Sequence, residues 1–240
     1  MRVGRLAMAG GPVWIREGGV PIEDPLRAFA AGREPADAGA ALSGEPIAPV
    51  DPVVIVGIAQ NGPGHPSPVQ AWLKSPRTVV RSGDAVVLRR DAGATVAEGE
   101  IAVVIGRRTD GLTADNAHEF VLGVTAVNDL SSPERSVRDP RNFESKSGGG
   151  YTPLGPWIDT SAGIDDVELA VVVDGEGVAA TSSAELPMSI RECLAYVASW
   201  TPLGPGDVVM TGAPHSQAPV EPGQTVTIRV AGVELITPLV

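Results

Sequence analysis

Residues 96–106 read Val-Ala-Glu-Gly-Glu-Ile-Ala-Val-Val-Ile-Gly, and no other stretch says more about the architecture of the chain. The apolar run predicts a buried β-strand, in which successive side chains point to opposite faces. Glu98 and Glu100 therefore emerge on one face, about 6–7 Å apart along the strand. Two like charges beside such a run repel each other and lose solvation unless a cation lies between them. From this spacing alone, solvated glutamates at a strand edge remain the alternative.

A second apolar run adds a third carboxylate. Residues 120–127 are almost entirely apolar and end at Asn128-Asp129, so Asp129 is delivered from the end of a strand. Three carboxylates with no cysteine or histidine nearby suit a hard cation. We expect Glu98, Glu100 and Asp129 to bind Mg²⁺, with Mn²⁺ or Ca²⁺ as alternatives.

The order of the motifs resembles the fumarylacetoacetate hydrolase family. That family typically reads E-x-E-L-A-V-V-I-G, then A-N-D, then P-L-G-P-W, then P-G-D-V-I-L-T-G-T-P. The counterparts here are Glu98–Gly106, Gly123–Asp129, Pro153–Trp157 and Pro205–Pro214, and the resemblance runs from about Pro52 to the C-terminus. The resemblance implies a metal-dependent enzyme that acts on a 2-oxo acid through a metal-bound enolate.

The composition agrees with a metabolic enzyme of mixed but mostly β structure. The chain has 240 residues, 43% hydrophobic and 4% aromatic, with 29 Gly and 22 Pro, which favours short strands and tight turns. A net charge of −11 without a basic cluster disfavours nucleic-acid binding. No apolar run is long enough for a bilayer, and the single Cys193 fits a reducing cytoplasm.

We expect residues 1–50 to form a small N-terminal β appendage and connector, and residues 51–240 a catalytic domain with the family's rolled β-sheet core. The appendage begins with a hairpin around Gly10-Gly11. Two helices are expected, one over Ala114–Phe120 and one that starts at Ser189, where Glu192 completes a capping box. The strands are expected at residues 53–58, 85–88, 100–105, 121–127, 167–173, 207–211 and 225–230. The negative charge and open sheet edges lead us to expect a homodimer.

The resemblance also implies roles for residues around the carboxylates. Lys146 follows Asp129 by 17 residues, the spacing at which the family places a lysine that faces the metal and contacts the substrate. An ammonium there would stabilise developing oxyanion character. Without the motif, Lys146 would be read as a surface lysine in a Ser/Gly-rich loop. Lys74 resembles the lysine of the family's F-x-K-P, and Thr211 and Gly212 belong to its T-G-T-P, although Ala213 lacks the second hydroxyl.

Two loops depart from the family pattern. Hydrolase-like members carry N-Y-x-x-H-x-x-E, whose His–Glu pair activates water, whereas Ala59 and Gln60 follow the first strand here. His65 then lies two positions late, with no glutamate before Lys74, so it is either a proton shuttle or a plain loop histidine.

The second departure follows Asp129, where relatives read N-D-V-S-A-R-D and the arginine holds a substrate carboxylate. This chain has an S-x-P-E-x-S loop at residues 131–136, with Arg138 beyond it as the candidate substrate-binding arginine. The loop resembles the branch that isomerises 2-hydroxyhepta-2,4-diene-1,7-dioate and decarboxylates its oxo precursor, 5-carboxymethyl-2-oxo-hex-3-ene-1,6-dioate, in aromatic catabolism.

Three functions therefore compete. The first is an isomerase or decarboxylase of an unsaturated 2-oxo acid or diacid, which the broken dyad and the loop favour. The second is a hydrolase that cleaves C–C bonds in acylpyruvates or fumarylacetoacetate-type diketo acids. The third is a repurposed or non-catalytic homologue, against which the intact carboxylates and Lys146 argue.

Overall fold

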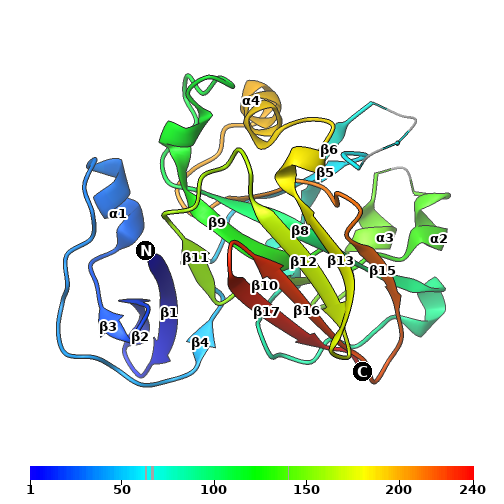
Figure 1. Cartoon of the computed structure of the whole chain (residues 1–240), viewed down its shortest axis with the longest axis horizontal. Coiled ribbons are helices and arrows are strands. Elements are labelled where there is room, and N and C mark those ends of the chain that lie inside the picture. The colour runs from blue at the N-terminus through cyan, green and yellow to red at the C-terminus, as the bar shows by residue number, and fades with distance from the viewer. Residues whose placement is uncertain (63, 66–67, 140) are drawn as a thin grey trace.

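The chain folds around one long central strand, β8 (Thr95–Ile105), which contains the Glu98-Gly99-Glu100 sequence. The computed structural model describes residues 1–62, 64–65, 68–139 and 141–240. A large mixed sheet follows the order β3-β2-β1-β11-β9-β8-β14-β5-β6, so β8 has partners on both sides (Figure 1). Mostly β structure with short helices confirms the expected fold class.

The remaining strands of the large sheet are β1 (Arg2–Met8), β2 (Gly11–Arg16), β3 (Val20–Pro21), β4 (Pro46–Ile47), β5 (Ile55–Ala59), β6 (Gln70–Lys74), β7 (Val79–Arg81), β9 (Val121–Asn128), β10 (Thr152–Leu154), β11 (Trp157–Asp159), β14 (Val208–Met210) and β15 (Gln217–Val220). A second, antiparallel sheet has the order β13-β12-β16-β17 and comprises β12 (Glu168–Val173), β13 (Glu176–Ser182), β16 (Thr225–Val230) and β17 (Val233–Pro238).

The second sheet packs against one face of β8 and β9. Ile101, Val103, Val171 and Ile228 are all buried in the core between the sheets. A Cβ placed on Gly99 would lie 2.5 Å from the Val171 side chain, closer than real atoms approach. Glycine at this position therefore lets the second sheet approach β8 on the face opposite to Glu98 and Glu100.

The helices are short, and they lie outside the sheets (Figure 1). In the described part of the chain, four are α-helical, namely α1 (Pro25–Ala30), α2 (Pro133–Ser136), α3 (Phe143–Lys146) and α4 (Ile190–Trp200), and four are 3₁₀ turns at Pro76–Thr78, Arg90–Ala92, Ala117–Phe120 and Ser183–Glu185. The capping box predicted for α4 is present, with Ser189 and Glu192 each bonding the other's backbone. None of the described helices is both long and apolar enough to cross a membrane.

Cys193 lies in the core on the buried face of α4. Burial raises the pKa of its thiol to about 12. A buried thiol whose pKa is raised in this way is inert as a nucleophile.

Two expected elements differ from the structure. Residues 85–88 form no strand, because Val86 makes only one isolated bridge, to Leu239. The helix expected over Ala114–Phe120 is reduced to the 3₁₀ turn at Ala117–Phe120. The reason is local, since the Thr113 N–H donates to Asn116 Oδ1 at 2.7 Å and so holds a turn before the helix can begin.

The N-terminal hairpin forms as expected. β1 pairs with β2 from Val3 opposite Arg16 to Met8 opposite Gly11, and β1 also pairs with β11, so the hairpin extends the large sheet (left in Figure 1). Asp24 caps α1 by accepting the Leu26 N–H at 2.9 Å. The domain boundary at residue 50 stays a prediction.

Substitution of Gly99 by alanine should test the packing of the second sheet on β8. The new methyl group must displace Val171, so we expect Gly99→Ala to lower the free energy of unfolding by about 1–3 kcal/mol. Gly177→Ala on β13 is the matched control, because no atom lies within 4 Å of its Cβ position; its change should stay within about 0.5 kcal/mol. Urea unfolding followed by circular dichroism measures both. Equal stabilities of the two variants would contradict this packing.

Candidate active site

The three carboxylates predicted from sequence come together at the junction of β8 and β9. The two strands pair with Glu100 opposite Val127 and Gly99 opposite Asn128, so Asp129 follows directly beside Glu98. The Asp129 N–H donates to the Glu98 carbonyl at 2.9 Å, which fixes this register. One carboxylate oxygen from each of Glu98, Glu100 and Asp129 lies within 4.8 Å of the other two.

Two ammonium groups converge on Asp129. Lys146, the last residue of α3, donates to Asp129 Oδ2 at 2.6 Å and lies 2.9 Å from Glu98 Oε1. Lys74, at the end of β6, donates to Asp129 Oδ1 and to the Tyr151 carbonyl. These are the two lysines of the chain. Lys146 is buried, so it is not a surface lysine of a mobile loop.

The charges of this cluster shift one another's ionisation. Burial by itself lowers the pKa of Lys146, because desolvation disfavours the charged form, but Asp129, Glu98 and Glu100 together outweigh it and hold the Lys146 pKa above its ordinary value. Desolvation also opposes ionisation of Asp129, but Lys146 and Lys74 outweigh it and lower the pKa of Asp129. Burial lowers the pKa of Lys74 despite its contact with Asp129.

Glu100 is the carboxylate with the least compensation. It is 3% exposed and accepts the Gly212 N–H at 2.8 Å. Burial, followed by the charge of Asp129, raises the pKa of Glu100 well above its ordinary value. A bound cation between the three carboxylates would remove this penalty, because it favours the ionised form of each. The donor set of three carboxylate oxygens therefore fits a hard divalent metal ion.

Backbone geometry around Gly212 explains why glycine stands there. Gly212 has φ +94°, and a Cβ at this position would lie 2.8 Å from Asn61 Cβ. Thr211 is fully buried beside it, and its hydroxyl donates to the Ile101 carbonyl at 3.1 Å. Gly212 thus lies at the cavity, whereas the Thr211 hydroxyl is used to fasten this turn to β8.

A cavity of about 550 Å³ opens over the carboxylates. Two of its walls come from segments far apart in sequence, namely the end of β5 with the following turn and the α2–α3 segment. Its lining residues include His65, Trp72, Gly212, Lys146 and all three carboxylates. Lys74 is fully buried behind Asp129 and is not part of this lining.

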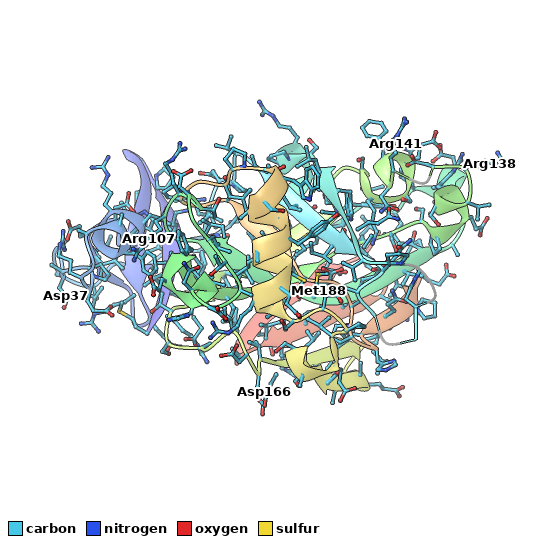
Figure 2. All side chains as sticks on the ribbon, turned by 90° about the horizontal axis from the view of Figure 1, so that it is seen from above. Asp37, Arg107, Arg138, Arg141, Asp166 and Met188 are labelled. Carbon is cyan, nitrogen blue, oxygen red and sulfur yellow. The ribbon has the colours of Figure 1, made fainter. Side chains whose placement is uncertain are left out.

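Arg138 is not brought to the carboxylates. It lies just beyond α2, in a separate hollow with Asp91, Gly93, Glu134 and Arg135. Figure 2 shows the labelled Arg138 and Arg141 at the outer edge of the molecule. The role assigned to Arg138 in substrate binding stays a prediction that its position does not favour.

The sequence alone did not single out Asn61, which joins three parts of the site. Its amide donates to the carbonyls of Met188 and Thr211, each at 2.9 Å, and its oxygen accepts the Met188 N–H at 2.8 Å. The sequence did hold a signal for Asn61, because Asn61 and His65 have the N-x-x-x-H spacing of the family's N-Y-x-x-H-x-x-E. With Asn61 as the start, His65 is in register, and the position of the glutamate is Pro68.

A model of the family described as the C-terminal part of fumarylacetoacetate (FAA) hydrolase matches residues 49–240. The chain belongs to the fumarylacetoacetate hydrolase family. The resemblance inferred from the motif order is therefore confirmed.

Named relatives within this family catalyse different reactions. A bifunctional isomerase/decarboxylase of 4-hydroxyphenylacetate degradation from Salmonella dublin is 31% identical over 166 residues, which cover 68% of this chain and 39% of that protein. A maleylpyruvate hydrolase from Aquipseudomonas alcaligenes is 29% identical over 171 residues, which cover 69% of this chain and 58% of that protein. The chain thus spans about two fifths to three fifths of the length of these two relatives.

The fold of this chain is similar to that of a solved structure over nearly the full length of both chains. The crystal structure of a 5-carboxymethyl-2-hydroxymuconate delta-isomerase from Mycobacterium smegmatis has a TM-score of 0.89 and 30% identity, and the match covers 100% of this chain and 99% of that one. The N-terminal residues that lie outside the family match at 49–240 are thus included in the structural similarity.

Binding of a divalent cation should raise the free energy of unfolding of the protein. Mg²⁺ or Mn²⁺ at about 100 times its dissociation constant should stabilise the protein by about 2.7 kcal/mol. Glu100→Gln should abolish this gain, and the variant should fold because glutamine resembles the neutral carboxyl that burial favours. Exposed Glu176→Gln is the matched control and should respond like the wild type. Thermal unfolding after chelation and cation readdition measures the effect; an undiminished gain in Glu100→Gln would remove Glu100 from the ligand set.

Proposed function

We propose that this protein is a divalent-metal-dependent isomerase or decarboxylase of an unsaturated 2-oxo acid. The observation that carries the proposal is the cluster of Glu98, Glu100, Asp129 and Lys146 at one cavity. When bound to the three carboxylates, a divalent cation would supply Lewis acidity to the oxygens of a 2-oxo acid and so favour an enolate beside its ketone. Mg²⁺ is the cation we propose, because all three ligands are hard oxygens.

Lys146 supplies the second part of the chemistry. Its contacts with Asp129 and Glu98 hold the ammonium at the carboxylates, and it lines the cavity in which the substrate would lie. The same acidic neighbours keep its pKa raised, so it stays protonated at neutral pH. We assign to Lys146 the stabilisation of negative charge that develops on the substrate.

The preference for isomerisation or decarboxylation rests on what hydrolysis requires. Water attack needs an oriented base, worth roughly 10²–10⁴-fold in rate. His65 lies at the cavity, but proline stands where the family's glutamate would orient it. Loss or relocation of a proton, or loss of CO₂, does not require that pair. The relatives named as isomerases agree with this preference.

Hydrolysis of a C–C bond in an acylpyruvate or related diketo acid is the second candidate. Two observations favour it: His65 lies at the cavity in the family's register with Asn61, and one relative is named a maleylpyruvate hydrolase. A rearranged proton path through His65 would be needed in place of the His–Glu pair.

The setting we propose is cytoplasmic, with a role in the breakdown of aromatic compounds, and with a homodimer as the assembly. A single buried cysteine is consistent with a reducing compartment. The strand β6 ends the path of the large sheet, and such an edge is a surface on which a second copy could pair.

A substrate panel with Mg²⁺ separates the candidate functions. Unsaturated 2-oxo acids should be isomerised or decarboxylated faster than acylpyruvates and fumarylacetoacetate-type diketo acids are cleaved. Ultraviolet absorbance follows the diene, and coupled assays follow CO₂ and pyruvate. Fast release of pyruvate from acylpyruvates would instead establish the hydrolase, and inactivity on the whole panel would favour a repurposed homologue.

Substitutions of Lys146 and His65 should separate the two parts of the chemistry. Lys146→Met should lower kcat/KM by about 10²–10³ on every substrate, because charge stabilisation is common to all the reactions. His65→Ala should change isomerisation by less than about tenfold, since the base is worth its full 10²–10⁴-fold only when water must be activated. Arg108→Ala, an exposed cation, is the control and should leave kcat/KM within about twofold. Full activity of Lys146→Met would contradict its assignment.

A further inference from the structure

The charged side chains Glu98, Glu100, Asp129 and Lys146, which line the cavity, are clustered together. Beyond the carboxylates and Lys146, its wall is formed by neutral polar groups. These are the amides of Gln60, Asn61, Gln70, Asn142 and Gln217 and the hydroxyls of Ser131, Ser136 and Ser145, beside the indole of Trp72. The Asn61 amide is already bonded to Met188 and Thr211, so a substrate that extends away from the carboxylates meets mainly the uncharged amides of Gln70, Asn142 and Gln217.

Among the described residues that line the cavity, few side chains can carry a positive charge. Lys146 is paired with Asp129 and Glu98, and the proposed function uses it at the reacting end. His65 is the other residue of the described lining that can become positive. Residues 63, 66, 67 and 140, outside the described part of the chain, are three prolines and a serine, whose side chains carry no charge.

The nearby arginines of this segment, Arg135, Arg138 and Arg141, do not line the cavity. Arg135 lies 3.6 Å from Glu144 and donates to the Asp91 carbonyl, and Arg138 shares a hollow with Asp91 and Glu134. Both lie outside the cavity lining. A second carboxylate on a substrate would therefore gain no guanidinium here, in contrast to the substrate arginine expected from the sequence.

Gln60 lines the cavity without presenting its side-chain oxygen to it. Its backbone is left-handed, with φ +65°, directly after β5. Its side-chain Oε1 is buried, and no group in the described residues donates to it. An oxygen without exposed surface is not reached by a ligand in the cavity, so Gln60 contributes a neutral part of the wall and no free acceptor.

We propose that the substrate is a 2-oxo acid with a single carboxylate. The end of the substrate away from the 2-oxo acid group would be uncharged and would form hydrogen bonds with the glutamine-rich part of the cavity wall (Gln60, Gln70 and Gln217). This rests on the proposed function, because the carboxylate cluster and Lys146 are assigned to the 2-oxo acid end. A second carboxylate would lose its hydration against neutral amides and would find no cation of the described lining in that part of the wall to replace it, apart from a protonated His65. A carboxamide or hydroxyl loses less on leaving water, and it can both donate to and accept from the neutral amides of the wall.

Two ligands of the same shape test this directly. 2-Oxoheptanedioate and its C7 carboxamide differ in the charge at one end, and both are saturated, so no double bond can be isomerised during the measurement. Binding to the full chain is measured by isothermal titration calorimetry with Mg²⁺ present, with 2-oxobutanoate as a probe of the 2-oxo acid end alone. We expect the carboxamide to bind at least tenfold more tightly than the diacid.

Variants at Gln70 locate the effect. Gln70 is exposed on the edge strand β6, so substitution there should leave the fold intact. Gln70→Arg should shift the preference toward the diacid by tenfold or more, because it places a guanidinium in the wall. Gln70→Met, which removes the amide without adding charge, should retain the preference for the carboxamide.

The outcomes distinguish this inference from the proposed function. If 2-oxobutanoate binds only with Mg²⁺ but the wild type prefers the diacid, the single-carboxylate substrate is wrong and the proposed function stands. If 2-oxobutanoate and both longer ligands fail to bind, the proposed function fails and the inference fails with it.

Discussion

The arrangement of this protein depends on one buried carboxylate, Asp129, held between two ammonium groups. Lys74 reaches it from β6 and Lys146 from α3, and both lysines of the chain are used in this way, whereas the surface cations are arginines. A carboxylate taken out of water is costly unless it is paired, so these contacts stabilise more than a local geometry. They join the edge of the large sheet and the α2–α3 segment to the end of β9, and they define one wall of the cavity.

The second constraint is the two-residue period of β8. Glu98 and Glu100 face the cavity, and Gly99 between them faces Val171 of the second sheet. One strand therefore builds the site on one face and the core on the other, and a shift of register by one residue would exchange the two. The raised pKa of Glu100 reflects the same compromise, because a carboxylate has been placed next to a tightly packed interior.

Relatives of this chain carry names of different reactions, and the arrangement of the site offers a physical reason for that variety. A divalent cation held by such carboxylates would, together with an ammonium, stabilise the same kind of negative charge in an isomerisation, a decarboxylation or a hydrolysis. What the substrate is, and whether water attacks it, depends on the rest of the wall. In this chain that wall is rich in glutamine, and His65 lies there without the glutamate of the family pattern.

Local sequence patterns predicted the strand at β8 and the capped helix α4, because each depends on residues close together in the chain. Asp129 lies 29 residues beyond Glu100, and its part in the cluster was predicted from the end of a second apolar run and from the order of the motifs. Tertiary structure decided the rest. In the folded chain, Lys74 is buried and contacts Asp129, and Arg138 lies outside the cavity. Asn61 links the residue after β14 to the segment before α4. The helices α2 and α3 span four residues each, too few for a periodic pattern to reveal. These positions depend on long-range pairing of strands and charges, which sequence spacing does not encode.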